Sequence, residues 1–142
     1  MITSISISHV WVFDQDEALD FYVGKLGLEV SADMEIGGAM RWLTVRPKGV
    51  TDREILLEKV APPSVDPDAA AKIRELISKG ASGFSVGFVT PDANALFQEL
   101  KSKGVEITEE PTVQMYGTDF AVRDPFGNHI RLVQPAAGFA GA

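Results

Sequence analysis

The chain has 142 residues, of which 45% are hydrophobic and 23% are charged, and its formal net charge is −7. These values predict one soluble globular domain with enough apolar side chains for a core. The acidic balance, with a sequence pI of about 4.7, argues against nucleic acid or an anionic membrane surface as a partner.

The sequence contains no cysteine, which excludes disulfides, thiol nucleophiles and thiolate metal sites. The first residues show neither the basic region nor the apolar region of a secretory signal. No apolar run approaches the roughly 18 residues that a membrane span needs. We therefore expect a cytoplasmic protein.

The first half of the chain predicts a strand, a helix and three more strands. A run of β-branched and aromatic residues at 5–13 predicts the opening strand. Asp14 and Asp16 are candidate N-caps of a helix that extends to about Lys25. The three further strands, separated by turns that contain glycine or proline, are expected at about 28–35, 39–47 and 53–60.

A connector marked by prolines, at 62–83, separates this half from a second one and contains a predicted helix at 68–79. The second half predicts a strand at 84–90 and a helix that Pro91-Asp92 opens. Its remaining elements are strands at about 105–109, 113–123 and 128–134, followed by a frayed tail at 136–142.

The order strand, helix and three strands thus occurs twice, which indicates an internal duplication. Offsets of 73 to 77 positions align His9-Val10 with Ser85-Val86, Asp16 with Asp92, Val45-Arg46 with Val122-Arg123, and Glu58 with Arg131. We expect a single α+β domain over 1–142, built from βαβββ modules at about 5–61 and 84–135. The two sheets are expected to face a common cleft in which a ligand binds.

Two stretches carry a resemblance to a known family. They are HVWVFDQDEALDFYVGKLGLEV at 9–30 and VRDPFGNHIRLVQP at 122–135, and the second contains a D-P-x-G-N turn. Both are similar to the vicinal oxygen chelate superfamily, which includes glyoxalase I, fosfomycin- and bleomycin-resistance proteins, methylmalonyl-CoA epimerase and extradiol dioxygenases. The resemblance implies the tandem βαβββ fold and a homodimer. It does not imply one reaction, because one scaffold hosts many chemistries.

The resemblance also implies where a site lies. Metal-dependent members of the superfamily take their ligands from equivalent places in the two modules, and the matching positions here are His9, Glu58, Ser85 and Arg131. A one-residue shift would replace Glu58 by Leu57. Serine is a poor ligand, and arginine has no lone pair to offer. We therefore expect the usual divalent metal site to be lost, with Arg131 paired to Glu58 or holding a ligand oxygen.

The first function that fits is metal-free binding of a small organic molecule, as in bleomycin-resistance proteins. Trp11 and Phe13 share the expected face of His9, and Trp42 and Ser85 complete the candidate ligand-binding residues. The alternative for these aromatic side chains is a place in the core, which is their commoner role.

The second function that fits is catalysis. Without a metal, His9 or Glu58 would act as a general base, and Arg131 would stabilise an enolate or another oxyanion. With a divalent metal held by His9 and Glu58, lyase, isomerase or dioxygenase chemistry would follow. His9 also fits a purely structural role on its strand. The residues alone leave open whether the protein is an enzyme.

Overall fold

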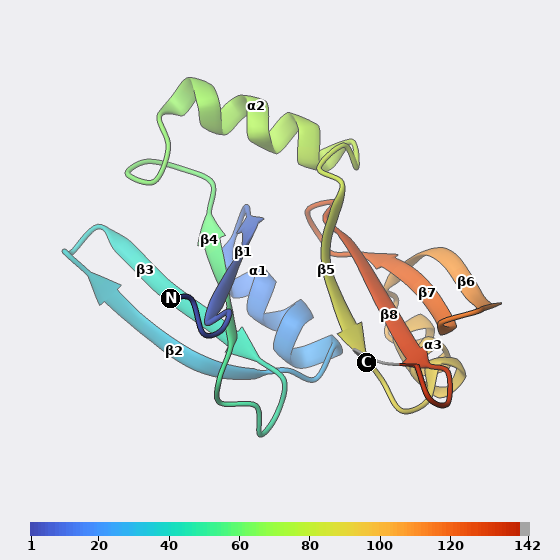
Figure 1. Cartoon of the computed structure of the whole chain (residues 1–142). Coiled ribbons are helices and arrows are strands. Elements are labelled where there is room, and N and C mark those ends of the chain that lie inside the picture. The colour runs from blue at the N-terminus through green and yellow to red at the C-terminus, as the bar shows by residue number, and fades with distance from the viewer. Residues whose placement is uncertain (140–142) are drawn as a thin grey trace. The chain divides into compact units, whose positions relative to one another are not determined.

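The computed structural model describes residues 1–139 and divides into two compact units, one from Met1 to Leu76 and one that begins at Ile77. Each unit contains one four-stranded sheet of mixed parallel and antiparallel strands, with helices (Figure 1). The α+β class is thereby confirmed. The common cleft and the module limits stay predictions.

The first unit follows the expected order of elements. Its elements are β1 (Ile7–Val12), α1 (Gln15–Leu19), η1 (Asp20–Lys25), β2 (Glu29–Ile36), β3 (Met40–Arg46) and β4 (Glu54–Lys59). The strands lie side by side in the order β1-β4-β3-β2, with β1 and β4 parallel and the other pairs antiparallel. The helix α2 (Pro67–Ser78) follows and contains the boundary between the units.

The second unit repeats this topology. Its elements are β5 (Phe84–Val89), α3 (Ala93–Ser102), β6 (Glu106–Gln114), β7 (Gly117–Arg123) and β8 (His129–Pro135). The strand order is β5-β8-β7-β6, and β5 and β8 are the parallel pair. Two sheets with the same order and the same parallel pair support the predicted duplication.

Alternation of apolar residues explains how each sheet forms its core. In the first sheet, Val12, Leu43 and Leu57 are fully buried, on the face that α1 and η1 cover with Ala18, Phe21 and Tyr22. The second sheet is covered by α3, which buries Phe97 and Leu100, and the Phe97 ring meets that of Phe120 edge to face. One face of each sheet is therefore committed to the core of its own unit.

Strand register confirms part of the residue match between the halves. Val10 pairs with Leu57, and the matched residues Val86 and Ile130 also pair. Likewise Trp11 pairs with Glu58 as Gly87 pairs with Arg131. Glu58 and Arg131 thus occupy equivalent places in the parallel pairs of the two sheets.

Two other matches are wrong. Asp14, and not Asp16, is the N-cap equivalent to Asp92: each accepts a hydrogen bond from the backbone N–H three residues on. The loop before the second helix is therefore two residues longer than the first.

The third strands are also offset by two residues. In the first sheet, Val45 pairs with Ile55. The match of Glu58 to Arg131 would make Asn128 the equivalent of Ile55, and so the partner of Val122. The partner of Val122 is instead Ile130. An even offset leaves every side chain on its face of the sheet, so the core pattern survives the shift.

The expected strands at 105–109 and 113–123 have the wrong limits. The strand β6 continues through Pro111 to Gln114, and the turn lies at Met115-Tyr116. Proline is tolerated because β6 is an edge strand, where a missing N–H costs no ladder bond, and the register shifts between Glu109 and Thr112. Residues 140–142 of the expected frayed tail lie outside the described residues.

The first helix differs from its prediction in kind. It begins after Asp14 as expected but changes to a π-helix at Asp20, where Leu26 N–H donates to the Phe21 carbonyl five residues back. Nowhere in residues 1–139 does a helix have the length and apolar character required to cross a membrane.

Candidate functional site

The candidate site of the first unit lies on the face of the sheet opposite to α1. His9 and Trp11 alternate along β1 with the buried residues Val10 and Val12, so they point away from the core. The register places Glu58 of β4 beside Trp11. Leu57, the alternative to Glu58, is fully buried on the other face and cannot contribute to this site.

His9 and Glu58 are in direct contact. The His9 Nε2 lies 2.8 Å from Glu58 Oε1, with 37% of the histidine side chain and 16% of the glutamate side chain exposed. The ring of Trp11 stands nearly perpendicular to the imidazole, with ring centroids 4.4 Å apart. A carboxylate at Nε2 favours the tautomer with its hydrogen there, which leaves Nδ1 as the ring nitrogen that can accept a hydrogen bond.

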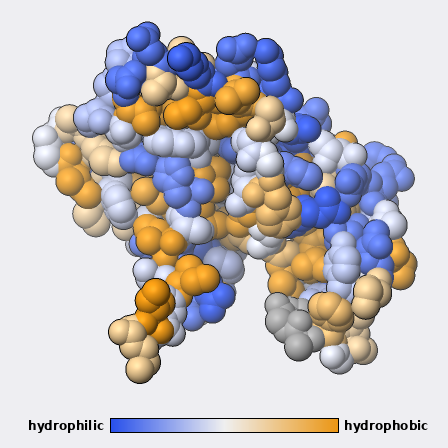
Figure 2. All heavy atoms as spheres, turned by 45° about the horizontal axis from the view of Figure 1, so that its top comes forward, coloured by the Kyte–Doolittle hydropathy of each residue, from blue (hydrophilic) through white to orange (hydrophobic). Residues whose placement is uncertain are grey.

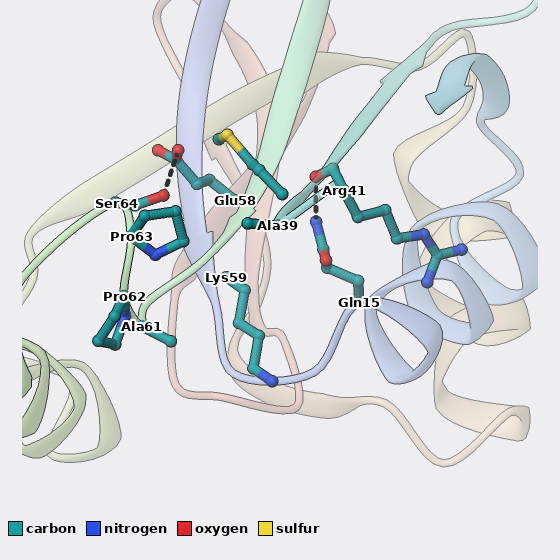
Figure 3. Close-up of a pocket in the computed structure, with 10 residues that line it drawn as sticks. Gln15, Ala39, Arg41, Glu58, Lys59, Ala61, Pro62, Pro63 and Ser64 are labelled. Atoms are coloured by element: carbon teal, nitrogen blue, oxygen red, sulfur yellow. Dashed lines mark hydrogen bonds between the residues drawn. The ribbon is translucent and has the colours of Figure 1, made fainter. Parts of the chain in front are cut away.

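Ser64 is a further member of the site that the sequence did not indicate. Its Oγ donates to Glu58 Oε2 at 2.8 Å (Figure 3). Because His9 contacts Oε1, both oxygens of the carboxylate are engaged. Ser64 belongs to the expected connector. No motif marks it, because its contact with Glu58 depends on how the chain turns after β4.

A pocket opens beside Glu58. Its lining comes from the start of α1, the start of β3, the end of β4 and the chain just after it: Gln15, Ala39, Met40, Arg41, Glu58, Lys59, Ala61, Pro62, Pro63 and Ser64 (Figure 3). Gln15 fixes one wall, since its Nε2 donates to the carbonyls of Arg41 and Leu57 at 3.0 Å each. The cavity volume is about 60 Å³. That volume fits a substituent or water, and is far below the roughly 300–1,000 Å³ of a complete ligand pocket.

The two other aromatic candidates are half-buried. Trp42 lies two residues before Thr44, which pairs with Leu56, and Leu56 pairs with His9. Trp42 therefore shares the face of His9 and Trp11. Phe13 follows the last residue of β1.

Arg131, the candidate of the second unit, is neutralised within its own sheet. Its Nη2 lies 2.7 Å from Asp119 Oδ2 and 2.7 Å from Glu109 Oε2, and its Nε donates to the same Asp119 oxygen at 3.0 Å. The guanidinium lowers the pKa of Glu109, and the two carboxylates raise the pKa of Arg131. Tyr116 completes the cluster, because its hydroxyl donates to Asp119 at 2.9 Å, which raises the tyrosine pKa. Arg131 was expected to pair with Glu58 or to hold a ligand oxygen; its guanidinium contacts two carboxylates of its own sheet, those of Asp119 and Glu109.

Ser85 lies in an irregular part of β5, where the register with β8 shifts between Phe84 and Val86. Its Oγ is 3.5 Å from Asn128 Oδ1, which is long for a hydrogen bond between two oxygens. The contact of Ser64 Oγ with Glu58 Oε2 in the first unit is closer, at 2.8 Å.

A divalent metal of the kind that the resemblance implies does not fit these residues. His9 Nε2 and both oxygens of Glu58 contact one another or Ser64. The residues at the other two matched positions are poor candidates, because serine is a weak ligand and arginine has no lone pair to offer. In the described part of the chain, no three His, Asp or Glu residues are grouped so that they could hold a metal ion. Catalytic metals generally need three firm protein ligands.

Comparison with known proteins agrees with this fold. A family model described as "Glyoxalase/Bleomycin resistance protein/Dioxygenase superfamily" matches residues 4–132. The uncharacterized protein YurT of Bacillus subtilis (strain 168) is 35% identical over 133 residues, covering 92% of this chain and 98% of YurT.

Two solved structures are similar over nearly the whole chain. UcmS2 has a TM-score of 0.88 and 38% identity, covering 94% of this chain and 98% of UcmS2. TnmS3, an antibiotic binding protein from Streptomyces sp. CB03234, has a TM-score of 0.74 and 30% identity, covering 95% of this chain and 98% of TnmS3.

Proposed function

The chain belongs to the Glyoxalase/Bleomycin resistance protein/Dioxygenase superfamily, and on that premise we propose that it binds a small organic molecule at the His9 face of its first sheet. The observation that carries the proposal is the contact of His9 with both Trp11 and Glu58. An apolar ring beside one oriented hydrogen-bonding group is the usual composition of a small-molecule site.

The chemistry of this face favours a flat ligand with one hydrogen-bond donor. Trp11 and Trp42 offer aromatic surface, on which a planar molecule stacks or packs edge to face. His9 Nδ1 accepts a hydrogen bond from a ligand hydroxyl or amine. The net charge of −7 favours neutral or cationic molecules over anions. TnmS3 is called an antibiotic binding protein, and its likeness to this chain supports the same class of activity.

Binding is preferred to catalysis because of Arg131. An oxyanion-stabilising cation must be free to meet developing charge, but this guanidinium already meets two carboxylates. The His9–Glu58 pair retains one feature of a general base, since a carboxylate orients the imidazole. Proton transfer by His9 is therefore the second candidate function, and it would require no metal.

Titration by tryptophan fluorescence tests the proposal. A panel of neutral and cationic polycyclic aromatic compounds, including antibiotics, is expected to quench the emission of Trp11 and Trp42, and Trp11→Phe should remove the part of the quenching that comes from Trp11. His9→Ala should weaken binding about tenfold, the effect of about one hydrogen bond to a ligand. Arg53→Ala, at an exposed ion pair, is the control and should bind as wild type does.

Metal removal supplies the matching negative result. Because the proposed site uses no divalent ion, treatment with a chelator should leave the dissociation constant unchanged. Binding that disappears with the chelator and returns with a divalent ion would overturn the metal-free proposal.

We also propose that the protein is a cytoplasmic homodimer. Two of the edge strands, β2 and β6, carry exposed apolar side chains, among them Met34 and Ile36 on β2 and Val113 on β6. Figure 2 shows apolar atoms exposed among polar ones on the surface. Such edges are commonly covered by another chain. Light scattering at tens of micromolar should give twice the chain mass of 15.3 kDa, and a monomeric mass would contradict the proposal.

A further inference from the structure

The chain that leaves β4 folds back on the end of that strand. Val60 N–H donates to the carbonyl of Val12 at 3.0 Å, which ties the exit of β4 to the end of β1. A turn then forms, in which the N–H groups of Ser64 and Val65 both donate to the carbonyl of Ala61, at 3.0 and 3.3 Å. This turn places Ser64 against the side chain of Glu58.

The Glu58 carboxylate is held at both ends by this arrangement. Oε1 meets His9 Nε2, and Oε2 accepts from Ser64 Oγ, each at 2.8 Å. A carboxylate bonded through one oxygen can still rotate about its terminal torsion, which is broad in glutamate. A second hydrogen bond from a fixed turn removes that freedom and keeps Oε1 directed at the imidazole.

We propose that Ser64 is a positioning residue for His9: by holding Glu58 Oε2, it fixes the carboxylate that sets the tautomer and the ring orientation of the histidine. Ser64 acts on the ligand only through Glu58 and His9, and the proposal rests on the function proposed above. It assigns a role to the segment Ala61–Ser64, which otherwise only connects β4 to α2.

The pocket beside Glu58 explains what the loss of the Ser64 hydroxyl would do. Ser64 and Glu58 line the same cavity of about 60 Å³ (Figure 3). Without the hydroxyl, water in this cavity would compete for Glu58 Oε2 without the fixed direction that the turn provides. Positioning by Ser64 is therefore an orienting effect, and its loss should change His9 more than it changes the stability of the fold.

Proton NMR of the unliganded protein tests this directly. His9 and His129 are the only histidines of the chain, so imidazole N–H signals are few, and His9→Asn assigns them. At low temperature, wild type should show a downfield Nε2–H signal from His9. Ser64→Ala should weaken this signal through exchange with water or shift it upfield, and Ser64→Thr, which keeps the hydroxyl, should restore it.

Controls separate positioning from a structural effect. Ser102→Ala removes another serine hydroxyl, which donates to the Glu99 carbonyl at 2.6 Å, and should leave the His9 signal unchanged. Unfolding midpoints of Ser64→Ala and Ser102→Ala should be similar. If Ser64→Ala leaves the His9 signal as in wild type, or if Ser64→Thr fails to restore it in a folded protein, the positioning role is overturned.

Ligand titration distinguishes this proposal from the function on which it rests. If both hold, Ser64→Ala should weaken ligand binding by about threefold to tenfold, and His9→Ala at least as much. If Ser64→Ala alters the His9 signal while His9→Ala leaves binding intact, the positioning stands and the proposed binding site fails. If His9→Ala weakens binding while Ser64→Ala changes neither the signal nor the affinity, the proposed binding site stands and the positioning role of Ser64 fails.

Discussion

Asp124→Ala should lower the free energy of unfolding by about 3–5 kcal/mol, because this buried carboxylate holds a whole turn together. Its Oδ1 accepts hydrogen bonds from the backbone N–H groups of Phe126, Gly127 and Asn128, at 2.8–3.0 Å. Its Oδ2 accepts from Asn128 Nδ2 at 2.7 Å, and Asp124 is only 4% exposed. Alanine would leave these donors without the carboxylate that satisfies them.

The same turn depends on a glycine that the carboxylate keeps in place. Gly127 has a φ of +112°, which side chains rarely adopt, and a Cβ there would come within 2.1 Å of the Ile77 carbonyl oxygen. Water cannot easily take the place of the Asp124 carboxylate in this tightly packed turn. The decrease in the free energy of unfolding should therefore be larger than for an ordinary turn aspartate.

Urea denaturation followed by circular dichroism measures this effect. Asp52→Ala is the matched control. Asp52 is 67% exposed and forms an ion pair with Arg53, so this substitution should leave the free energy of unfolding nearly unchanged. Asp124→Asn, which keeps the shape and one acceptor, should fall between the two. A loss below about 1 kcal/mol for Asp124→Ala would show that the turn forms without its carboxylate.

The repeated order of elements could be predicted because each half carries its own local signals. Apolar alternation, the caps Asp14 and Asp92 and the turns between strands are all written in short stretches of sequence. The residue match was less accurate, since Asp16 was paired with Asp92. A loop that is two residues longer in one half cannot be recognised from sparse identities.

Pro111 shows where local signals mislead. The expected strands at 105–109 and 113–123 left Pro111 between them and included Met115 and Tyr116, whereas β6 continues through Pro111 to Gln114. Whether a proline is tolerated depends on the position of the strand in the sheet. In this chain the strand is at the edge, which is a property of the tertiary structure.

The candidate site was partly predictable for a similar reason. His9 and Glu58 lie on the same face of the neighbouring strands β1 and β4, so their contact follows from the topology. The partners of Arg131 lie likewise on one face of neighbouring strands, since Ala121 pairs with both Arg131 and Glu109, and Asp119 is two residues from Ala121. Ser64 does not follow from the topology, because its contact with Glu58 depends on the path of an irregular connector.

Arg131→Met should destabilise the second unit by about 2 kcal/mol at neutral pH, because it leaves Asp119 as a buried carboxylate without its cation. Asp119 is 4% exposed, whereas 24% of the Arg131 side chain is exposed, so the cost should be below that of a fully buried pair. Tyr116 would still donate to Asp119, which also limits the loss.

A double-mutant cycle isolates the pair. Asp119→Asn combined with Arg131→Met removes both charges, and the double variant should be less destabilised than the sum of the single variants, by about 1–3 kcal/mol. Arg53→Met is the control for the change of side chain, because it disrupts an exposed pair with Asp52 and should leave the unfolding midpoint unchanged. Additive losses at Asp119 and Arg131 would show that the two residues act independently.

The loss of stability caused by Arg131→Met should become smaller as the pH falls, because Glu109 becomes protonated. The guanidinium lowers the pKa of Glu109 in the folded protein, so this contact stabilises the fold above the unfolded pKa of about 4.3. That contribution is lost as the pH falls through the lower, folded value. The variant lacks the contribution at every pH, so its stability should approach that of wild type between about pH 6 and pH 3. A difference that stays constant over this range, measured by urea denaturation at each pH, would show that Glu109 gains nothing from Arg131.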